Sequence, residues 1–434
     1  MPHDAAELLQ KLIRFNTTNP PGDEAACIGW ITELCDQAGI DTRVVAKTDG
    51  RPNLLARVQG RGDAPPLLLQ GHVDVVTTAG QQWTHDPFGG ELIDGYIYGR
   101  GALDMKGGVA MMLAATLASA EAGEPPPGDL LLCALSDEEA LGTYGARFLV
   151  EEHAELFDGV KHALGEFGGA RTVFAGIPSY PIQVAEKQVC WTKVTIRGPG
   201  GHGSLPMHGG AMARLGRLLA KLDEQRLPVH VTQVPEAMVK ALAQAIPEHG
   251  DELANALLDP ERTDQTLDAL GEQGELLDAM LHNTVNATIV RGGDKVNVIP
   301  SEIVLELDGR LLPGQTEDDL FRELRELTGD DELEFEAACD PGPETADLSQ
   351  FALLAEVLQS ADPGTVAVPM LLPGVTDGRL FARLGIQSYG FLPMRLPAEM
   401  QFTKLIHAAD ERVPAEEIRW GADRIREVIQ RYKG

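Results

Sequence analysis

Short apolar runs alternate with helical patterns in the first part of the chain. Residues 67–69 form one run, a Gly-rich helical pattern covers residues 107–122, and a second apolar run covers residues 130–135. Because these runs are apolar at nearly every position, we expect strands that are buried on both faces of a mostly parallel sheet. Strands that alternate with helices in this way predict an α/β domain.

The pattern changes at about residue 188. Half-buried alternation begins there, an acidic helical stretch covers residues 235–281, and strand patterns follow around residues 296–311. Mixed patterns then resume, and an amphipathic helix is expected at residues 415–432. We predict a large α/β domain, a mixed, mostly parallel sheet sandwiched by helices, formed by residues 1–187 and 344–434. A smaller α+β domain is predicted as an insertion at residues 188–343.

Charge and composition narrow the function classes. The 434 residues include 36 basic and 66 acidic ones, a net charge of −30, which disfavours nucleic acid and anionic membranes as partners. No apolar stretch reaches the roughly 18 residues of a membrane span. Residues 1–15 form an amphipathic pattern with early acids, unlike a signal peptide, so we expect a cytoplasmic protein.

The cysteines form an odd set without a close C-x-x-C pair, so we expect neither a disulfide framework nor a thiolate zinc site. They are interpreted as small buried apolar residues. The five are Cys27, Cys35, Cys133, Cys190 and Cys339.

Polar residues that could carry chemistry follow the predicted strands. His72 and Asp74 come after the first apolar run, and alternation along a strand places them on one face. Asp104 precedes the Gly-rich helix, and Glu138 and Glu139 follow the second run. Taken singly, each has an ordinary interpretation: a buried hydrogen-bonded histidine, a helix cap, or an acidic solvated turn.

Two later residues complete the set. Glu166 ends a further apolar run, and His407 lies near the end of the chain. The three adjacent carboxylates after the second run, Asp137, Glu138 and Glu139, are costly at a strand end unless a cation or a proton compensates their charge. Two histidines and several carboxylates at strand ends form a mixed nitrogen and oxygen ligand set that suits Zn²⁺, Mn²⁺ or Co²⁺.

In this order the motifs resemble the dinuclear zinc metallopeptidases of family M20, which include glutamate carboxypeptidase, aminoacylase, succinyl-diaminopimelate desuccinylase and acetylornithine deacetylase. The resemblance runs over nearly the whole chain, and residues 16–22 and 295–300 look most like the carboxypeptidase and N-acyl-amino-acid hydrolase branch. It implies two divalent metal ions per chain, zinc first, with cobalt or manganese as alternatives. The implied ligands are His72, Asp104, Glu139, Glu166 and His407.

The resemblance also implies individual roles. Asp104 matches the carboxylate shared by both ions, Asp74 the acid that orients His72, and Glu138 the general base. His202 matches a histidine that reaches the tetrahedral oxyanion, generally in the partner subunit, after a closing motion. Asn297 and Arg310 match positions that hold a substrate carboxylate. Further implied is a homodimer through residues 188–343, which would act as a lid and dimerisation domain.

The implied reaction is hydrolysis of an amide bond that releases a free amino acid, from a peptide C-terminus or an N-acyl-amino acid. Its substrate is therefore a small molecule of one of these two kinds. Desuccinylation or deacetylation in amino-acid biosynthesis is the alternative within the family. A non-catalytic binding protein on the same fold is the alternative of another class.

Overall fold

The structure is a computed structural model that describes residues 3–174, 176–397, 400 and 402–434. The described chain divides into two compact units. The first comprises Met1–Val184, Asp347–Met370 and Thr376–Gly434, and the second comprises Ala185–Ala346 and Leu371–Val375. The first unit therefore brings together the beginning and the end of the chain.

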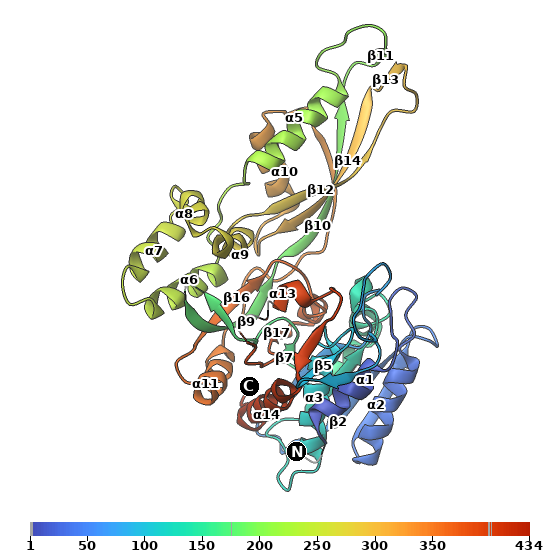
Figure 1. Ribbon diagram of the computed structural model, residues 1–434, viewed down its shortest axis with the longest axis vertical. Coiled ribbons are helices and arrows are strands. Elements are labelled where there is room, and N and C mark those ends of the chain that lie inside the picture. The colour runs from blue at the N-terminus through green and yellow to red at the C-terminus, as the bar shows by residue number, and fades with distance from the viewer. Residues whose placement is uncertain (1–2, 175, 398–399, 401) are drawn as a thin grey trace. The chain divides into compact units, whose positions relative to one another are not determined.

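A mixed sheet forms the centre of the first unit (Figure 1). In spatial order its strands are β1 (Asp41–Ala46), β2 (Pro52–Val58), β6 (Leu130–Leu135), β3 (Leu67–His72), β7 (His162–Gly165), β17 (Gln387–Gly390), β9 (Ile177–Glu186) and β16 (Val366–Leu372), with β8 (Thr172–Phe174) beside β9. The pairs β6–β3, β3–β7 and β7–β17 are parallel, whereas β1–β2, β2–β6 and β17–β9 are antiparallel. The predicted α/β class is confirmed, with the parallel pairs at the centre of the sheet.

Helix α3 (Lys106–Ala120) is buried on almost every side, as its uniformly apolar sequence requires. Helices α1 (Ala5–Ile13) and α14 (Ala415–Arg431) pack against it. Asp4 caps the N-terminus of α1, where its side chain accepts a hydrogen bond from the backbone N–H of Ala6. The first two residues of the N-terminal amphipathic pattern lie outside the described part. The remaining helices of this unit are α2 (Ala25–Gln37), α4 (Ala146–Glu152), α11 (Phe351–Ala361), α12 (Gly378–Phe381) and α13 (Phe402–Leu405).

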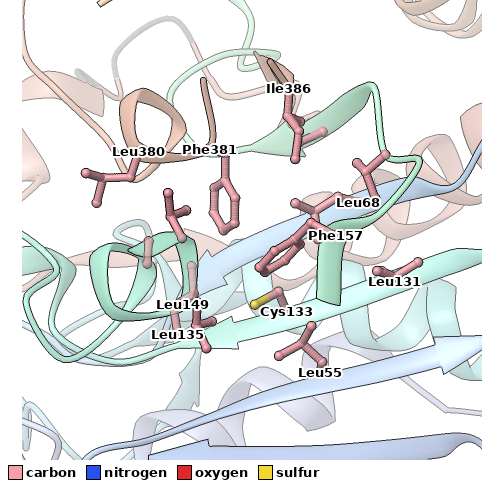
Figure 2. Packing of buried hydrophobic residues seen from close by; sticks show 14 of the residues in the cluster. Leu55, Leu68, Leu131, Cys133, Leu135, Leu149, Phe157, Leu380, Phe381 and Ile386 are labelled. Atoms are coloured by element: carbon pink, nitrogen blue, oxygen red, sulfur yellow. The ribbon is translucent and has the colours of Figure 1, made fainter. Parts of the chain in front are cut away.

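The alternation of side chains along β6 explains how one strand serves two layers. Leu131, Cys133 and Leu135 point into a buried cluster with α4 and α12, which Figure 2 shows around Phe157 and Phe381. The intervening residues of β6 point to the opposite face, where α3 packs against the sheet. Burial on both faces holds the ends of the central strands in place.

A small three-stranded sheet joins two distant parts of the first unit. It contains β4 (Glu91–Ile93), β5 (Tyr96–Tyr98) and β18 (Arg412–Pro414), in the order β18-β5-β4. Arg412 pairs with Tyr98 in antiparallel register. The segment just before residue 104 therefore lies beside the segment just after residue 407.

The second unit is an α+β structure built on an antiparallel sheet. Its strands are β12 (Thr284–Arg291), β14 (Glu302–Leu311), β10 (Gln188–Arg197) and β15 (Glu334–Cys339), in that spatial order. Helices α5 (Ala211–Glu224) and α10 (Glu317–Thr328) contribute to its apolar core. The acidic stretch folds as α6 (Gln233–Ala245), α7 (Gly250–Leu257), α8 (Thr263–Leu270) and α9 (Glu272–Leu281), and β11 (Gly201–His202) pairs with β13 (Val298–Ile299).

One prediction about the cysteines is wrong. Cys190 and Cys339 lie opposite each other on β10 and β15 and form a disulfide. The two are 149 residues apart in sequence, so their spacing carried no signal of pairing. The other cysteines are free and buried, as expected; they are Cys27, Cys35 and Cys133. No helix among the described residues is both long and apolar enough to cross a membrane.

Candidate metal centre

Three neighbouring strands deliver polar side chains to one edge of the central sheet. His72 is the last residue of β3, and Glu138 and Glu139 begin a short 3₁₀ turn (Glu138–Ala140) that follows β6. Glu166 comes directly after β7. Because β6, β3 and β7 are parallel, their carboxyl ends meet at the same edge, where α/β sheets place their sites.

Two further residues come from loops. Asp104 lies two residues before α3, and His407 lies five residues before β18. The pairing of β18 with β5 brings these loops together, and His407 Nε2 is 3.2 Å from Asp104 Oδ2. The sequence patterns alone did not show that this late histidine would meet the early aspartate.

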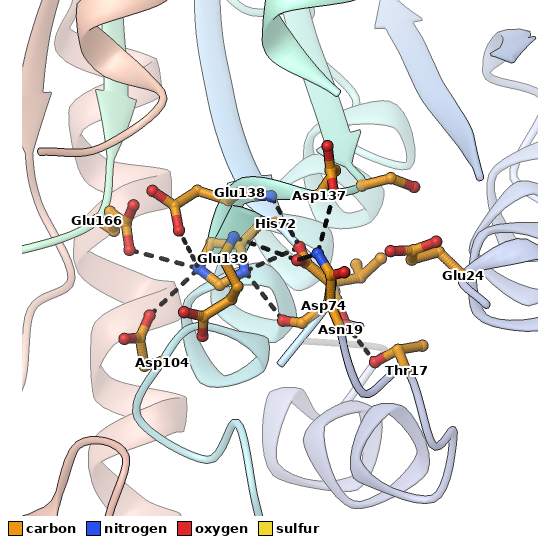
Figure 3. Close-up of polar contacts among 12 residues, drawn as sticks. Thr17, Asn19, Glu24, His72, Asp74, Asp104, Asp137, Glu138, Glu139 and Glu166 are labelled. Atoms are coloured by element: carbon orange, nitrogen blue, oxygen red, sulfur yellow. Dashed lines mark hydrogen bonds and ion pairs between the residues drawn. The ribbon is translucent and has the colours of Figure 1, made fainter. Parts of the chain in front are cut away.

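The side chains converge on the imidazole of His72 (Figure 3). His72 Nε2 lies 3.2 Å from Asp104 Oδ1 and 3.5 Å from Glu166 Oε2. It also lies 3.9 Å from Glu138 Oε2. On the other side of Asp104, His407 Nε2 is 3.3 Å from Glu139 Oε1. Asp104 thus turns one carboxylate oxygen toward each imidazole.

Asp74 holds the other side of this cluster. Its Oδ1 is 3.4 Å from His72 Nδ1 and accepts a hydrogen bond of 3.1 Å from the backbone N–H of Glu138. Its Oδ2 accepts a hydrogen bond of 3.2 Å from the backbone N–H of Glu139. One buried carboxylate therefore contacts the imidazole and also holds the turn that presents both glutamates.

A buried polar network behind Asp74 was not found by sequence reasoning. The side-chain amide of Asn19 donates to Asp74 Oδ2 at 2.8 Å and to Asp137 Oδ1 at 3.0 Å. Arg51 lies 2.9 Å from Asp137 Oδ1 and makes a bidentate ion pair with Glu24. Figure 3 shows Asn19 between the two aspartates. The sequence signals were the position of Asp137 next to the paired glutamates and the family resemblance of residues 16–22, which include Asn19.

The electrostatics of the cluster reflect many carboxylates in a buried space. Burial, with the charge of Glu166, raises the pKa of Glu138 well above its usual value. Burial also raises the pKa of Glu166 to about 8, against the opposing effect of its hydrogen bond to His72. The adjacent carboxylates of Asp104 and then Glu139 raise the pKa of His407 to about 10. The cluster therefore needs compensating positive charge, which protons or cations can supply.

The donor set fits divalent metal ions. Ligand atoms of His72, Glu138 and Glu166 lie within 4.8 Å of one another, as do those of His72, Asp104 and Glu139. Among the described residues the buried Glu139 Oε1 has no hydrogen-bond partner, although His407 Nε2 is 3.3 Å away. A buried carboxylate oxygen without a hydrogen bond is costly in a protein and is well placed as a ligand. Imidazole and carboxylate groups together suit zinc and its neighbours.

The other predicted site residues lie in the second unit. His202 is exposed, pairs with Val298 across β11 and β13, and makes a 2.8 Å contact from Nδ1 to Ser204 Oγ. The backbone carbonyl of Asn297 accepts a hydrogen bond from Gly203, so Asn297 lies beside the His202 loop. Arg310 lies near the far end of β14, where its guanidinium pairs with Asp308 at 2.8 Å. The structure brings His202 and Asn297 together but not Arg310.

Comparisons with known proteins identify the family of this chain. The model of "Peptidase family M20/M25/M40" matches residues 68–431. A succinyl-diaminopimelate desuccinylase of Paracoccus denitrificans is 27% identical over 99% of this chain and 98% of its own. The human N-fatty-acyl-amino acid synthase/hydrolase PM20D1 is 27% identical over 84% of this chain and 74% of its own.

A solved structure shows the same fold. The M20 family metallo-carboxypeptidase Sso-CP2 from Sulfolobus solfataricus has a TM-score of 0.65 at 16% identity and covers 99% of both chains. At that identity the likeness concerns the fold alone, whereas the family model spans most of the sequence. The chain belongs to peptidase family M20/M25/M40 and is a metal-dependent hydrolase.

Proposed function

We propose that the protein hydrolyses an amide bond to release a free amino acid, from a peptide C-terminus or from an N-acyl-amino acid. The observation that carries the proposal is the convergence of two imidazoles and four carboxylates at one sheet edge, with Asp104 between the imidazoles. In the proposed assignment His72 and Glu166 would hold one ion, Glu139 and His407 would hold the other, and the Asp104 carboxylate would be shared by both. The ions are proposed to be zinc, with cobalt or manganese as alternatives.

When bound, two such ions would polarise a substrate carbonyl and lower the pKa of an attacking water. Glu138 supplies the base. Its ionised carboxylate accepts the proton from the attacking water and passes it to the departing amide nitrogen, so that an acid and an amine leave. Asp74 supports this step because it holds the backbone of Glu138 and contacts the imidazole of His72.

The second unit is proposed as the lid and dimerisation domain predicted at residues 188–343. His202 is assigned to the developing oxyanion, and Asn297 and Arg310 to a substrate carboxylate. Self-association gains support from β12, the edge strand of its sheet, where Ile289 and Val290 are exposed apolar residues. Sedimentation velocity of the wild type and of Val290→Lys tests it: a dimer is expected for the first and a shift toward monomer for the second.

A second candidate within the family is desuccinylation. The Paracoccus desuccinylase supports it because that relative and this chain match over nearly their whole lengths. N-acyl-amino-acid hydrolysis is supported by the resemblance of residues 16–22 and 295–300 and by the human relative. A non-catalytic role on the same fold is disfavoured because every predicted ligand and the base are present. A cytoplasmic location stays a prediction.

The test is a substrate panel run with the wild type and with Glu138→Gln. The panel contains dipeptides and N-acetyl, N-succinyl and long-chain N-acyl amino acids, and release of free amino acid is measured after addition of Zn²⁺. We expect one class to be turned over by the wild type and not by the variant. Equal rates for both proteins would refute the role of Glu138, and no hydrolysis of any member would refute the proposed substrate class.

A further inference from the structure

Glu411 carries a fully buried carboxylate between the two loops of the metal centre. It lies four residues after His407. Its Oε1 accepts hydrogen bonds from the backbone N–H groups of Leu103, at 2.7 Å, and Asp104, at 3.2 Å. Its Oε2 accepts one from Gly101 at 3.2 Å. The carboxylate therefore fixes the backbone of the loop that presents Asp104.

The same carboxylate anchors a buried arginine that reaches the other loop. Arg100 is 1% exposed and donates from Nη1 to Glu411 Oε2. Its Nη2 donates to the backbone carbonyl of His407 at 3.2 Å and to Gln81 Oε1 at 2.8 Å. Gln81 Nε2 donates to that same carbonyl at 2.7 Å. Two side chains thus hold the backbone oxygen of His407.

His407 depends on this support because its own position is weakly constrained. Its side chain is 48% exposed, and its backbone has a φ of 62°, in the left-handed region that non-glycine residues rarely adopt. Such a conformation persists only where surrounding contacts enforce it. The hydrogen bonds from Arg100 and Gln81 to its carbonyl supply contacts of this kind.

We propose that Glu411, acting through Arg100 and Gln81, is a positioning residue that sets the spacing between Asp104 and His407. The inference rests on the proposed two-ion function. Gln81 holds the carbonyl of His407 directly and touches the Asp104 loop through Arg100. Its loss therefore weakens mainly the ion assigned to Glu139 and His407. Loss of the Glu411 carboxylate also loosens Asp104, which both ions share, and therefore weakens both.

The expected change in zinc affinity follows from what residues that orient metal ligands contribute in other metal sites. Removing a residue that orients a ligand typically lowers metal affinity by about 10- to 100-fold. For Gln81→Ala we expect about that loss for one ion and little change for the other. For Glu411→Gln we expect a loss of affinity of about that size for both ions. The amide of the new glutamine would direct an N–H donor at the backbone N–H groups that now donate to the carboxylate.

The experiment titrates chelator-stripped protein with Zn²⁺ against a chromophoric competitor, which reports each bound equivalent. Glu417→Gln is the matched control. Glu417 is also a buried carboxylate of the first unit, and it accepts hydrogen bonds from the backbone and guanidinium of Arg395. Thermal unfolding of the metal-free proteins runs in parallel, because a purely structural role would lower stability without changing one zinc affinity selectively.

The expected result is a selective loss of one zinc equivalent in Gln81→Ala, a loss at both in Glu411→Gln, and wild-type binding in Glu417→Gln. Wild-type affinity for both equivalents in Gln81→Ala, or an equal loss of both in that variant, would overturn the inference. Gln81 is partly exposed, so its variant remains informative if Glu411→Gln does not fold. A wild type that binds no zinc would overturn the proposed function itself.

Discussion

Replacing Asn19 by alanine removes the side-chain amide that links Asp74 to Asp137. Both aspartates are buried, and Asn19 itself is only 5% exposed. After the substitution Asp74 keeps the backbone N–H groups of Glu138 and Glu139, at 3.1 and 3.2 Å. The two carboxylates, however, lose the donor that lies between them, and their mutual repulsion is no longer offset at that point.

The expected cost follows from the two lost hydrogen bonds. Hydrogen bonds to charged groups contribute roughly 1.5–3 kcal/mol each, and relaxation recovers part of the loss. Arg51 still pairs with Asp137, so we expect the free energy of unfolding of the first unit to fall by about 2–4 kcal/mol. Because Asp74 also positions the turn at Glu138, kcat/KM should fall by about 10- to 100-fold.

Urea unfolding followed by tryptophan fluorescence measures the stability change. Three tryptophans, Trp30, Trp83 and Trp420, belong to the first unit, and all samples are stripped of metal. Asn16→Ala is the control, since Asn16 is exposed in the same segment and accepts hydrogen bonds only locally, from Thr18. It should change stability by no more than about 0.5 kcal/mol.

An isosteric variant separates charge from volume. Asn19→Asp fills the same space but adds a third carboxylate beside Asp74 and Asp137, so it should be at least as destabilising as Asn19→Ala at neutral pH. The reasoning is refuted if Asn19→Ala matches Asn16→Ala in both stability and kcat/KM. It is equally refuted if Asn19→Asp is as stable as the wild type.

Three further predictions concern other residues. Glu138→Gln should lower kcat by about 10²- to 10⁴-fold. Because burial raises the pKa of Glu138 and its ionised form acts as the base, wild-type kcat/KM should rise with pH at values above the usual glutamate range. A pH-rate profile without this rise would count against Glu138 as the base. His202→Ala should lower kcat more than it raises KM, and undiminished turnover in steady-state kinetics would remove its oxyanion role. Burial lowers the pKa of Lys187 to about 7, so between about pH 7 and 10 the unfolded chain binds more protons than the folded one, and the stability contributed by this group rises with pH. Urea unfolding of Lys187→Met at both ends of that pH window should lack this rise in stability. An unchanged rise in the variant would contradict the assignment.

Much of the first unit could be read from sequence because its central strands are buried on both faces. The run at β6 has apolar residues at every position, and its predicted bounds agree with the observed ones. Helix α3 was predicted almost as well, since it begins one residue earlier and ends two residues earlier than predicted. The helical pattern at residues 235–281 was predicted as one stretch, but turns at residues 247–249 and at Gly271 help divide it into separate helices.

The hydrogen-bond partners of the site could not be predicted in the same way. Asn19 and Arg51 act through contacts with residues 55 and 86 positions away along the chain, which no local pattern encodes. Arg100 and Glu411 are separated by 311 positions and meet only because β5 pairs with β18. The Cys190–Cys339 disulfide was missed for the same reason, since strand pairing and not spacing brings the two sulfurs together.

The proposed function requires that this cluster bind two metal ions and that hydrolysis depend on them. The most direct test is elemental analysis of protein purified without chelator, together with hydrolysis of the active substrate class before and after metal removal. We expect about two transition-metal ions per chain, with activity lost on stripping and restored by Zn²⁺, Co²⁺ or Mn²⁺. Protein that carries no metal after reconstitution, or that keeps its activity when stripped, would contradict it.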